Sequence, residues 1–368
     1  MNKLASTTII HVNRYATTRS GLELFANFHY SPQCRSELAD GGQRGGVISY
    51  HPGGMFTGSR DMDFVFPTVK QAILDDGHIL VQPGHRLLVP TSGHEILQDI
   101  RSFFDYLESD RFLAALPAGV NPDLNKVLVS GFSGGGYVAR LAAIELHERN
   151  LRSGQGKSKL GCVGLLSYFG MGGDVIKSPW IRAEGPQGDD NDTDSEIFDT
   201  ISRLYARGEI SDSPYPAEKR LKGWENDLER EPIWDWWNRC GTLSDTLCGT
   251  RGELRGSWGR SDSKKAEEVV PEKHHGLFPQ IYFEGLGMGS GFPPTMLVHG
   301  TTDELVPFEE SVTTRDQLQK AGVDVELVAV PGVDHWLRYS GKEESPVETE
   351  QAHAKVVEFI RRCIGRTV

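Results

Sequence analysis

The chain has 368 residues, a length that suits two to three domains or one large domain with an insertion. Hydrophobic residues make up 38% and charged residues 24%, an ordinary balance for a globular protein that can bury a core. Lys and Arg number 39 against 51 Asp and Glu, a formal net charge of −12. Because an acidic surface repels phosphate groups, nucleic acid is a poor candidate for a partner.

Two further observations concern membranes and location. No stretch reaches the roughly 20 apolar residues of a membrane-spanning helix, and the first residues lack the apolar run of a secretory signal. The five cysteines are odd in number and scattered along the chain. We therefore expect mostly reduced thiols and a cytoplasmic protein, although Cys240 and Cys248 are near enough in sequence to pair.

In chain order, the first elements predicted are two strands rich in β-branched and aromatic residues, Thr8–Arg14 and Leu22–Tyr30, separated by a Ser-Gly break. Short apolar runs then alternate with helical patterns. Strands are expected at residues 47–50, 78–81, 126–130 and 162–166. Helices are expected at residues 63–74 and 95–107, and another directly after the strand at 126–130.

The alternation stops near Gly170 and resumes near Met296. The last part predicts strands at 295–298 and 325–330, and helices at 307–320 and 351–364. Short buried strands alternating with helices are typical of a mostly parallel sheet with helices on both faces. We therefore predict an α/β core formed by residues 1–170 and 291–368.

Residues 171–290 differ from the rest, since they hold six of the seven tryptophans and an acidic run from Glu184 to Asp199. Asp194 and Ser195 can cap a helix that Gly208 would end. This interval is predicted to be an inserted, mainly helical cap, with a flexible acidic loop near residues 184–194. An acidic run could hold a cation, but a solvated loop is the simpler interpretation.

The sharpest chemical signal is Gly131-Phe132-Ser133-Gly134-Gly135, which fits the pattern G-x-S-x-G. A buried strand precedes it and a helix follows, the setting in which a nucleophilic serine occupies a tight, strained turn. The N-terminus of the next helix then faces any negative charge that develops. Ser133 is therefore the candidate nucleophile.

A serine hydroxyl needs a base, and the best placed of the 12 histidines is His335. It follows the last predicted strand, in a loop that can reach back over the end of the sheet. The base in turn needs a carboxylate to fix its tautomer, and Asp303 lies between a strand and a helix. Glu304 and Asp334 are its rivals, but adjacent side chains in an extended loop point apart, which disfavours Asp334.

An anion site is expected after the third strand, at His51-Pro52-Gly53-Gly54. Glycine lets backbone N–H groups approach a substrate oxygen closely, whereas proline has no N–H to donate. Gly53, Gly54 and Gly134 are the predicted donors. A plain Pro-Gly turn is the alternative.

Together these segments resemble the α/β-hydrolase superfamily, and within it the hormone-sensitive-lipase-like esterases, over about residues 45–170 and 293–340. That family has H-G-G-G where this chain has His51-Pro52-Gly53-Gly54, and an acid where this chain has Phe132. Its Y-R-L-x-P stretch is similar to residues 85–90, with one residue extra. Its H-G-x-x-D-x-x-V-P segment is matched in full at residues 299–307, and the order Ser, Asp, His is the order of α/β-hydrolases.

The resemblance implies a hydrolase that needs no cofactor or metal and cleaves carboxylic esters through an acyl-enzyme. Ser133 would attack the carbonyl, His335 would shuttle the proton, and Asp303 would orient His335. A lyase, cyclase or C–C bond hydrolase acting on a natural product is the nearest alternative, and a ligand receptor without activity is a more distant one. A small-molecule substrate is expected, with an aromatic-lined pocket built from Phe132, Trp236, Trp237 and Trp336, unless the cap tryptophans form only the core of the cap. The sequence does not indicate the oligomeric state.

Overall fold

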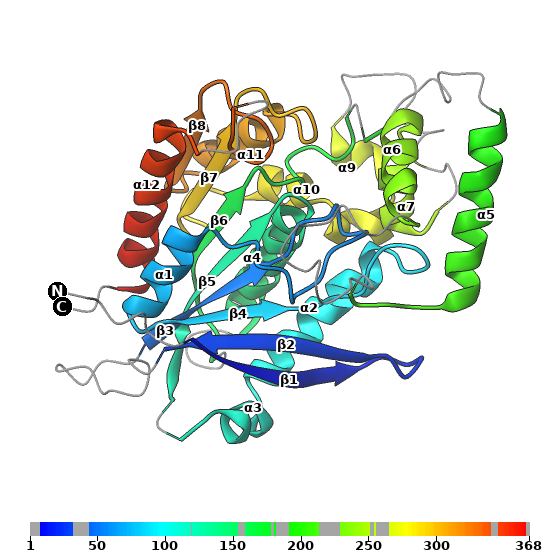
Figure 1. Cartoon of the computed structure of the whole chain (residues 1–368). Helices are drawn as coiled ribbons and strands as arrows, with labels where there is room; N and C mark the ends of the chain where they lie inside the picture. Colours follow the sequence, from blue (N-terminus) through cyan, green and yellow to red (C-terminus); the bar gives the residue numbers. More distant parts are fainter. Residues whose placement is uncertain are drawn as a thin grey trace.

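A computed structural model gives the arrangement of most of the chain (Figure 1). The structure describes residues 8–31, 44–118, 120–153, 159–177, 180–181, 191–212, 229–250, 254, 265–339 and 345–365. Of the acidic loop predicted near residues 184–194, residues 184–190 lie outside the described part, whereas residues 191–194 form the start of a helix (Asn191–Arg207), so the loop prediction is wrong there. Within the described part, no helix is both long and apolar enough to cross a membrane.

The centre of the molecule is an eight-stranded sheet in the order β1-β2-β4-β3-β5-β6-β7-β8. The first two strands pair antiparallel, β2 pairs antiparallel with β4, and the remaining neighbours are parallel. The strands are β1 Ile9–Thr17, β2 Glu23–Tyr30, β3 Arg44–Tyr50, β4 Ile79–Pro83, β5 Pro122–Phe132, β6 Cys162–Tyr168, β7 Thr295–Gly300 and β8 Val325–Val330. The prediction of a mostly parallel sheet in an α/β fold is confirmed.

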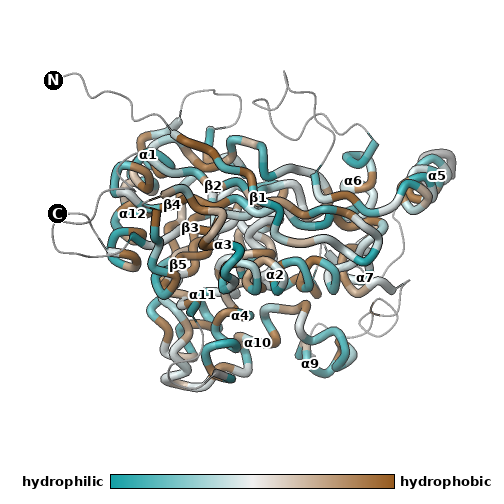
Figure 2. The backbone as a smooth tube through the Cα atoms, turned by 90° about the horizontal axis from the view of Figure 1, so that it is seen from below, coloured by the Kyte–Doolittle hydropathy of each residue, from teal (hydrophilic) through white to brown (hydrophobic). Residues whose placement is uncertain are grey.

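Helices cover both faces of the sheet (Figure 1). On one face α1 (Pro67–Asp75) packs with α12 (Val347–Ile364), and their apolar side chains form one core cluster with the strands. The other face carries α2 (Gly93–Leu107), α3 (Asp110–Ala115), α4 (Gly134–Ser153) and α11 (Glu309–Lys320) over a second cluster. The tube of Figure 2 shows the apolar strands β3, β4 and β5 in the interior. Their burial on both faces explains why they appear in the sequence as continuous apolar runs.

The described residues between β6 and β7 are mainly helical, as predicted. This interval contains α5 (Asn191–Arg207), α6 (Glu231–Cys240), α7 (Leu243–Cys248), α9 (Ala266–Val269), the 3₁₀ helix η3 (Glu272–Leu277) and α10 (Pro279–Gly285). In Figure 1, α5, α6 and α7 lie together beyond one end of the sheet. The last part of the interval is tied to the core instead, because the hydroxyl of Tyr137 on α4 donates to the carbonyl of Leu277 at 2.8 Å.

The predicted start of the first helix is wrong, and the cause is local. The sequence pattern places a helix at residues 63–74, whereas α1 begins at Pro67. The residue before a proline is driven away from helical angles, and Phe66 has φ −49° and ψ 132°. Proline itself is well suited to the first turn, where its missing N–H costs nothing.

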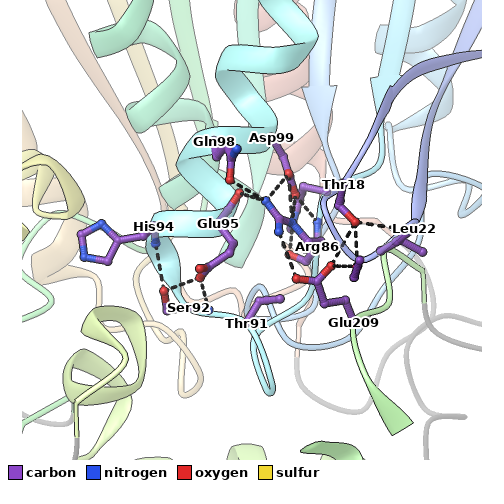
Figure 3. A network of polar contacts seen from close by, with 12 residues as sticks. Thr18, Leu22, Arg86, Thr91, Ser92, His94, Glu95, Gln98, Asp99 and Glu209 are labelled. Atoms are coloured by element: carbon purple, nitrogen blue, oxygen red, sulfur yellow. Dashed lines mark hydrogen bonds and ion pairs between the residues drawn. The ribbon is translucent and has the colours of Figure 1, made fainter.

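A buried ion-pair network fixes the segment that leaves α5 (Figure 3). The guanidinium of Arg86 donates to Asp99 on α2 at 2.8 Å and to Glu209 at 3.1 Å. The Arg86 and Asp99 side chains are only 6% and 2% exposed. Burial raises the pKa of Asp99 to about 6, against the opposing effect of its bonds to Arg86. Arg86 belongs to the stretch that resembles the family's Y-R-L-x-P, and its role in this fold is to join three segments.

We expect Asp99→Asn to destabilise the fold by about 3 kcal/mol, because it leaves the buried Arg86 charge without its main partner. Glu209→Gln removes a carboxylate that is 22% exposed and should cost about 1 kcal/mol or less. Urea unfolding of both variants measures the difference. Equal losses would contradict the assignment of Asp99 as the main partner.

Candidate active site

Ser133 occupies a sharp turn between β5 and α4. Its φ is +52°, a left-handed conformation that non-glycine residues rarely adopt. A Cβ on Gly131 would lie 2.0 Å from the carbonyl oxygen of Gly135, so the turn can close only with a glycine at position 131. The backbone N–H of Ser133 donates to Tyr168 on β6 at 3.0 Å, which ties the turn to the sheet. The G-x-S-x-G pattern thus forms the strained turn expected of it.

His335 lies in the loop after β8 and contacts Ser133. Its Nε2 is 3.0 Å from the Ser133 Oγ, and its Nδ1 is 2.7 Å from the Oδ2 of Asp303. A carboxylate can only accept, so Nδ1 carries the hydrogen and Nε2 is free to accept the serine proton. The rings of Phe169 and Trp336 pack against the imidazole at centroid distances of 4.6 and 5.1 Å. Two aromatic rings, which also contact each other at 6.0 Å, therefore pack against the base.

Asp303 sits in the turn after β7 with its side chain fully buried. Its Oδ1 accepts from the backbone N–H groups of Leu305 and Val306, both at 2.9 Å. Its Oδ2 accepts from His335 and also from the Nε2 of His299 at 3.1 Å. Burial would raise the pKa of Asp303, but the hydrogen bonds from the two histidines outweigh it and hold the pKa well below the ordinary value.

The two rival carboxylates lie elsewhere. Glu304 is exposed. The Oδ1 of Asp334 accepts from the backbone N–H groups of Trp336 and Arg338 at 2.9 and 3.0 Å, so it shapes the loop that carries His335. The structure thus brings Ser133, His335 and Asp303 together. It places neither Glu304 nor Asp334 in the position of Asp303.

The predicted oxyanion loop follows β3 and meets the serine turn. Gly53 and Gly54 have φ of +111° and +62°, which glycine adopts without strain. A Cβ on Gly134 would lie 2.5 Å from the backbone nitrogen of Gly54, so the two backbones are in contact. Gly53, Gly54 and Ser133 line one pocket. This is the arrangement in which backbone N–H groups could face an oxygen bound next to Ser133.

The proline that replaces the second residue of H-G-G-G is held by the preceding histidine. The Nδ1 of His51 lies 2.8 Å from the carbonyl oxygen of Pro52 and donates to it. The His51 ring stacks on His85, with 4.7 Å between centroids and 6° between planes. Burial lowers the pKa of His51 to about 4, so the ring is neutral near pH 7. The loop therefore keeps a fixed shape although Pro52 has no N–H to donate.

The pocket beside Ser133 encloses about 430 Å³, part of it open to solvent. Aromatic and aliphatic side chains dominate its walls, and the carboxylate of Glu231 adds one charge. The full set of lining residues is Gly53, Gly54, Phe56, Thr57, Ser133, Glu231, Trp234, Leu305, His335 and Trp336. Of the four predicted pocket residues, Trp336 is among them.

The other three predicted pocket residues are not among those lining residues. Phe132 is buried on the side of α1 and α12, stacked on Tyr168 at 4.7 Å. Trp237 is buried against Phe56, and Trp236 contacts Phe198 on α5. Side chains two residues apart on a helix point in different directions, so Trp236 cannot share the inward face of Trp234.

Five lining residues were not predicted from the sequence, namely Phe56, Thr57, Glu231, Trp234 and Leu305, and Trp234 is the largest of them. A Cβ on Gly54 would lie 2.5 Å from its ring, so the indole lies directly on the oxyanion loop. Its ring also packs near Trp180, at 5.9 Å. The signal was available, because Ile233, Trp234 and Trp237 have the spacing of one inward helical face.

Among the residues that the structure describes, no group of three or more His, Cys, Asp or Glu side chains is placed to hold a metal ion.

Comparison with known proteins gives one family match and several distant relatives. The model of the prolyl oligopeptidase family matches residues 290–367, the part that carries Asp303 and His335. A non-reducing polyketide synthase of Penicillium brasilianum is 27% identical over 367 residues. That alignment covers 94% of this chain but only 14% of the synthase.

Two solved structures of esterases share the architecture. A bacterial heroin esterase aligns over 97% of this chain and 84% of its own, with 15% identity and a TM-score of 0.57. Esterase 2 of Thermogutta terrifontis, in a form phosphoramylated by tabun, aligns over 98% and 96%, with 16% identity and a TM-score of 0.54. At these identities the likeness shows the fold alone.

Proposed function

We propose that this chain, an α/β-hydrolase by fold, is a serine hydrolase that cleaves a carboxylic ester or lactone of a small organic molecule through an acyl-enzyme. The observation that carries the proposal is the continuous contact from the Ser133 Oγ through His335 to Asp303, at 3.0 and 2.7 Å. Both distances suit hydrogen bonds along which a proton can move.

The chemistry follows from this geometry. Ser133 attacks the carbonyl carbon while the Nε2 of His335 takes its proton, and the resulting oxyanion faces the N–H groups of Gly53, Gly54 and Gly134. The anionic Asp303 stabilises the imidazolium, which then gives the proton to the leaving alcohol. Water, activated by the same His335, adds to the acyl-enzyme, and collapse returns the acid and the free serine.

The pocket supports an apolar or aromatic acyl group. Phe56, Trp234, Leu305 and Trp336 offer flat apolar walls to a substrate bound at Ser133. Glu231 is the one acidic residue among the lining residues. A neutral ester of an aromatic acid suits the apolar walls.

The likeness to polyketide synthases favours a second candidate within the same chemistry. A polyketide acyl group held as a thioester would be transferred to Ser133, with the thiol leaving together with the proton from His335. Attack by water or by a hydroxyl group of the same molecule would then release it from Ser133 as an acid or a lactone. Carbon–carbon cleavage or cyclisation of a polyketide would use the same residues. The products distinguish these reactions, because only simple hydrolysis yields an acid and an alcohol in equal amounts.

A labelling experiment tests the proposal. We expect a fluorophosphonate probe to modify this chain once, at Ser133, and to abolish turnover of short p-nitrophenyl esters in proportion to labelling. Peptide mapping by mass spectrometry locates the label. A chain that turns over no ester or lactone and takes no label would refute a serine hydrolase.

The pocket makes a separate prediction about acyl size. Trp234→Ala removes the indole that lies on Gly54, so the ratio of kcat/KM for a naphthoate ester to that for an acetate ester should rise about tenfold or more. Trp236→Ala is the matched control on the same helix, because that ring faces α5. Steady-state kinetics on both esters measures the ratio. An equal change in both variants would place the specificity elsewhere.

A further inference from the structure

A second buried imidazole contacts the carboxylate of the proposed triad. His299 lies on β7 with its side chain fully buried. Its Nε2 is 3.1 Å from the Oδ2 of Asp303, the same oxygen that accepts from His335. The same Nε2 is 3.0 Å from the carbonyl oxygen of Val306. Both neighbours can only accept, so Nε2 carries a hydrogen.

The other ring nitrogen is also engaged. The Nδ1 of His299 is 2.7 Å from the hydroxyl oxygen of Ser311 on α11, which is itself buried. In a neutral imidazole with its hydrogen on Nε2, Nδ1 is an acceptor, so the Ser311 hydroxyl donates to it. Ser311 thereby fixes the tautomer that His299 needs in order to donate to Asp303.

We propose that His299 is a positioning residue of the active site, which acts through Asp303 and never touches the substrate; this rests on the proposed serine hydrolase. The backbone amides of Leu305 and Val306 donate to the Oδ1 of Asp303, and His299 donates to its Oδ2. Together these bonds restrict the rotation of the carboxylate. With both oxygens engaged, Oδ2 stays aimed at the Nδ1 of His335. A neutral donor also stabilises part of the negative charge on Oδ2, which moderates how strongly Asp303 holds the His335 proton.

The surroundings leave few other sources for a pH effect. His299 faces Asp303, Ser311, the Val306 carbonyl and the Phe308 ring. His335 faces Ser133, Asp303 and the rings of Phe169 and Trp336. The Asp334 carboxylate is taken up by backbone amides, and Glu304 is exposed. Glu231 lines the same pocket as His335 and is unchanged in every variant that is compared. The titratable side chains that contact Asp303 within the described residues are thus the two imidazoles.

The sign of the pH effect follows. Without the His299 donor, the Asp303 carboxylate is a stronger base and holds the His335 proton more tightly. His335 then protonates more readily, and the acidic limb of kcat/KM moves to higher pH. A hydrogen bond of ordinary strength corresponds to a movement of about half a pH unit to one pH unit. Loosening of the fold alone would lower the rate without moving the limb upward.

The test compares His299→Leu with His299→Gln on one small ester. The leucine variant removes the donor, and kcat should fall about tenfold or more with KM within about twofold, while the acidic limb moves upward. Glutamine carries an N–H group at nearly the position of Nε2 and should restore most of the rate and the original limb. The proposal is overturned if the limb of the leucine variant stays in place or moves down, or if glutamine restores nothing.

A further variant covers the case in which His299→Leu does not fold. Ser311→Ala frees the tautomer of His299 and should shift the limb in the same direction, by less; an unchanged profile would overturn the proposal. Ser133→Ala separates the two levels of inference. If Ser133→Ala is inactive while the His299 and Ser311 variants behave like the parent, the serine hydrolase stands and only the proposed role of His299 is refuted. If Ser133→Ala keeps its activity, the serine hydrolase falls and the role of His299 with it.

Discussion

Replacing Ser133 by Ala should lower kcat for ester hydrolysis by about 10⁴-fold or more, while the protein folds normally. The loss follows from the removal of the only proposed nucleophile; what remains is the rate that the oxyanion site and substrate binding provide by themselves. The measurement is burst and steady-state kinetics on a p-nitrophenyl ester, with circular dichroism as the check on folding.

The folding control matters because Ser133 is in a strained turn. Alanine at φ +52° keeps the same backbone cost, so the unfolding free energy should change by less than about 1 kcal/mol. Ser130, on β5 and three residues earlier, is a matched buried serine outside the pocket lining, and Ser130→Ala should leave kcat within about threefold. A Ser133→Ala variant that retains a tenth of the parent activity would sink the assignment.

The sheet and the contact of Ser133, His335 and Asp303 could be predicted because each depends on local signals. Strands such as β5, β7 and β8 are continuous apolar runs, and the serine turn requires small residues that are visible in G-x-S-x-G. In a parallel sheet the turns after neighbouring strands meet at one edge. Asp303 after β7 and His335 after β8 therefore had to lie near Ser133 after β5.

The pocket and the second histidine could not be predicted in the same way. The helical spacing separates Trp236 from Trp234 and Trp237, but only the orientation of α6 on the core decides which of the two inward rings lies on Gly54. His299 is part of a sequence segment that matches a family pattern, but its bond to Asp303 depends on a turn that returns the carboxylate toward its own strand. The contact of Trp234 with Gly54 is set by the packing of segments distant in sequence, and that of His299 with Asp303 by the shape of one turn. The local residue pattern encodes neither.

Asp303→Asn tests the acid of the triad most directly. The change keeps the shape but removes the charge, so the imidazolium that forms during the reaction loses its stabilisation, and the amide can hold His335 in the wrong tautomer. We expect kcat to fall on the order of 10⁴-fold. Since the carboxylate favours protonation of His335, its loss should also move the acidic limb of kcat/KM to lower pH. This is opposite to the movement expected for His299→Leu.

Glu304→Gln is the control for that result, because it neutralises the adjacent carboxylate, which is exposed. An exposed carboxylate is well screened by solvent, so both the rate and the pH profile should stay close to those of the parent. The two variants are compared on one ester at equal ionic strength, which keeps screening constant between them. If Glu304→Gln were the damaging change and Asp303→Asn the mild one, the acid that orients His335 would be the neighbouring residue. The Asp303 carboxylate is buried and accepts hydrogen bonds on both of its oxygens, so we expect Asp303→Asn to be the damaging change.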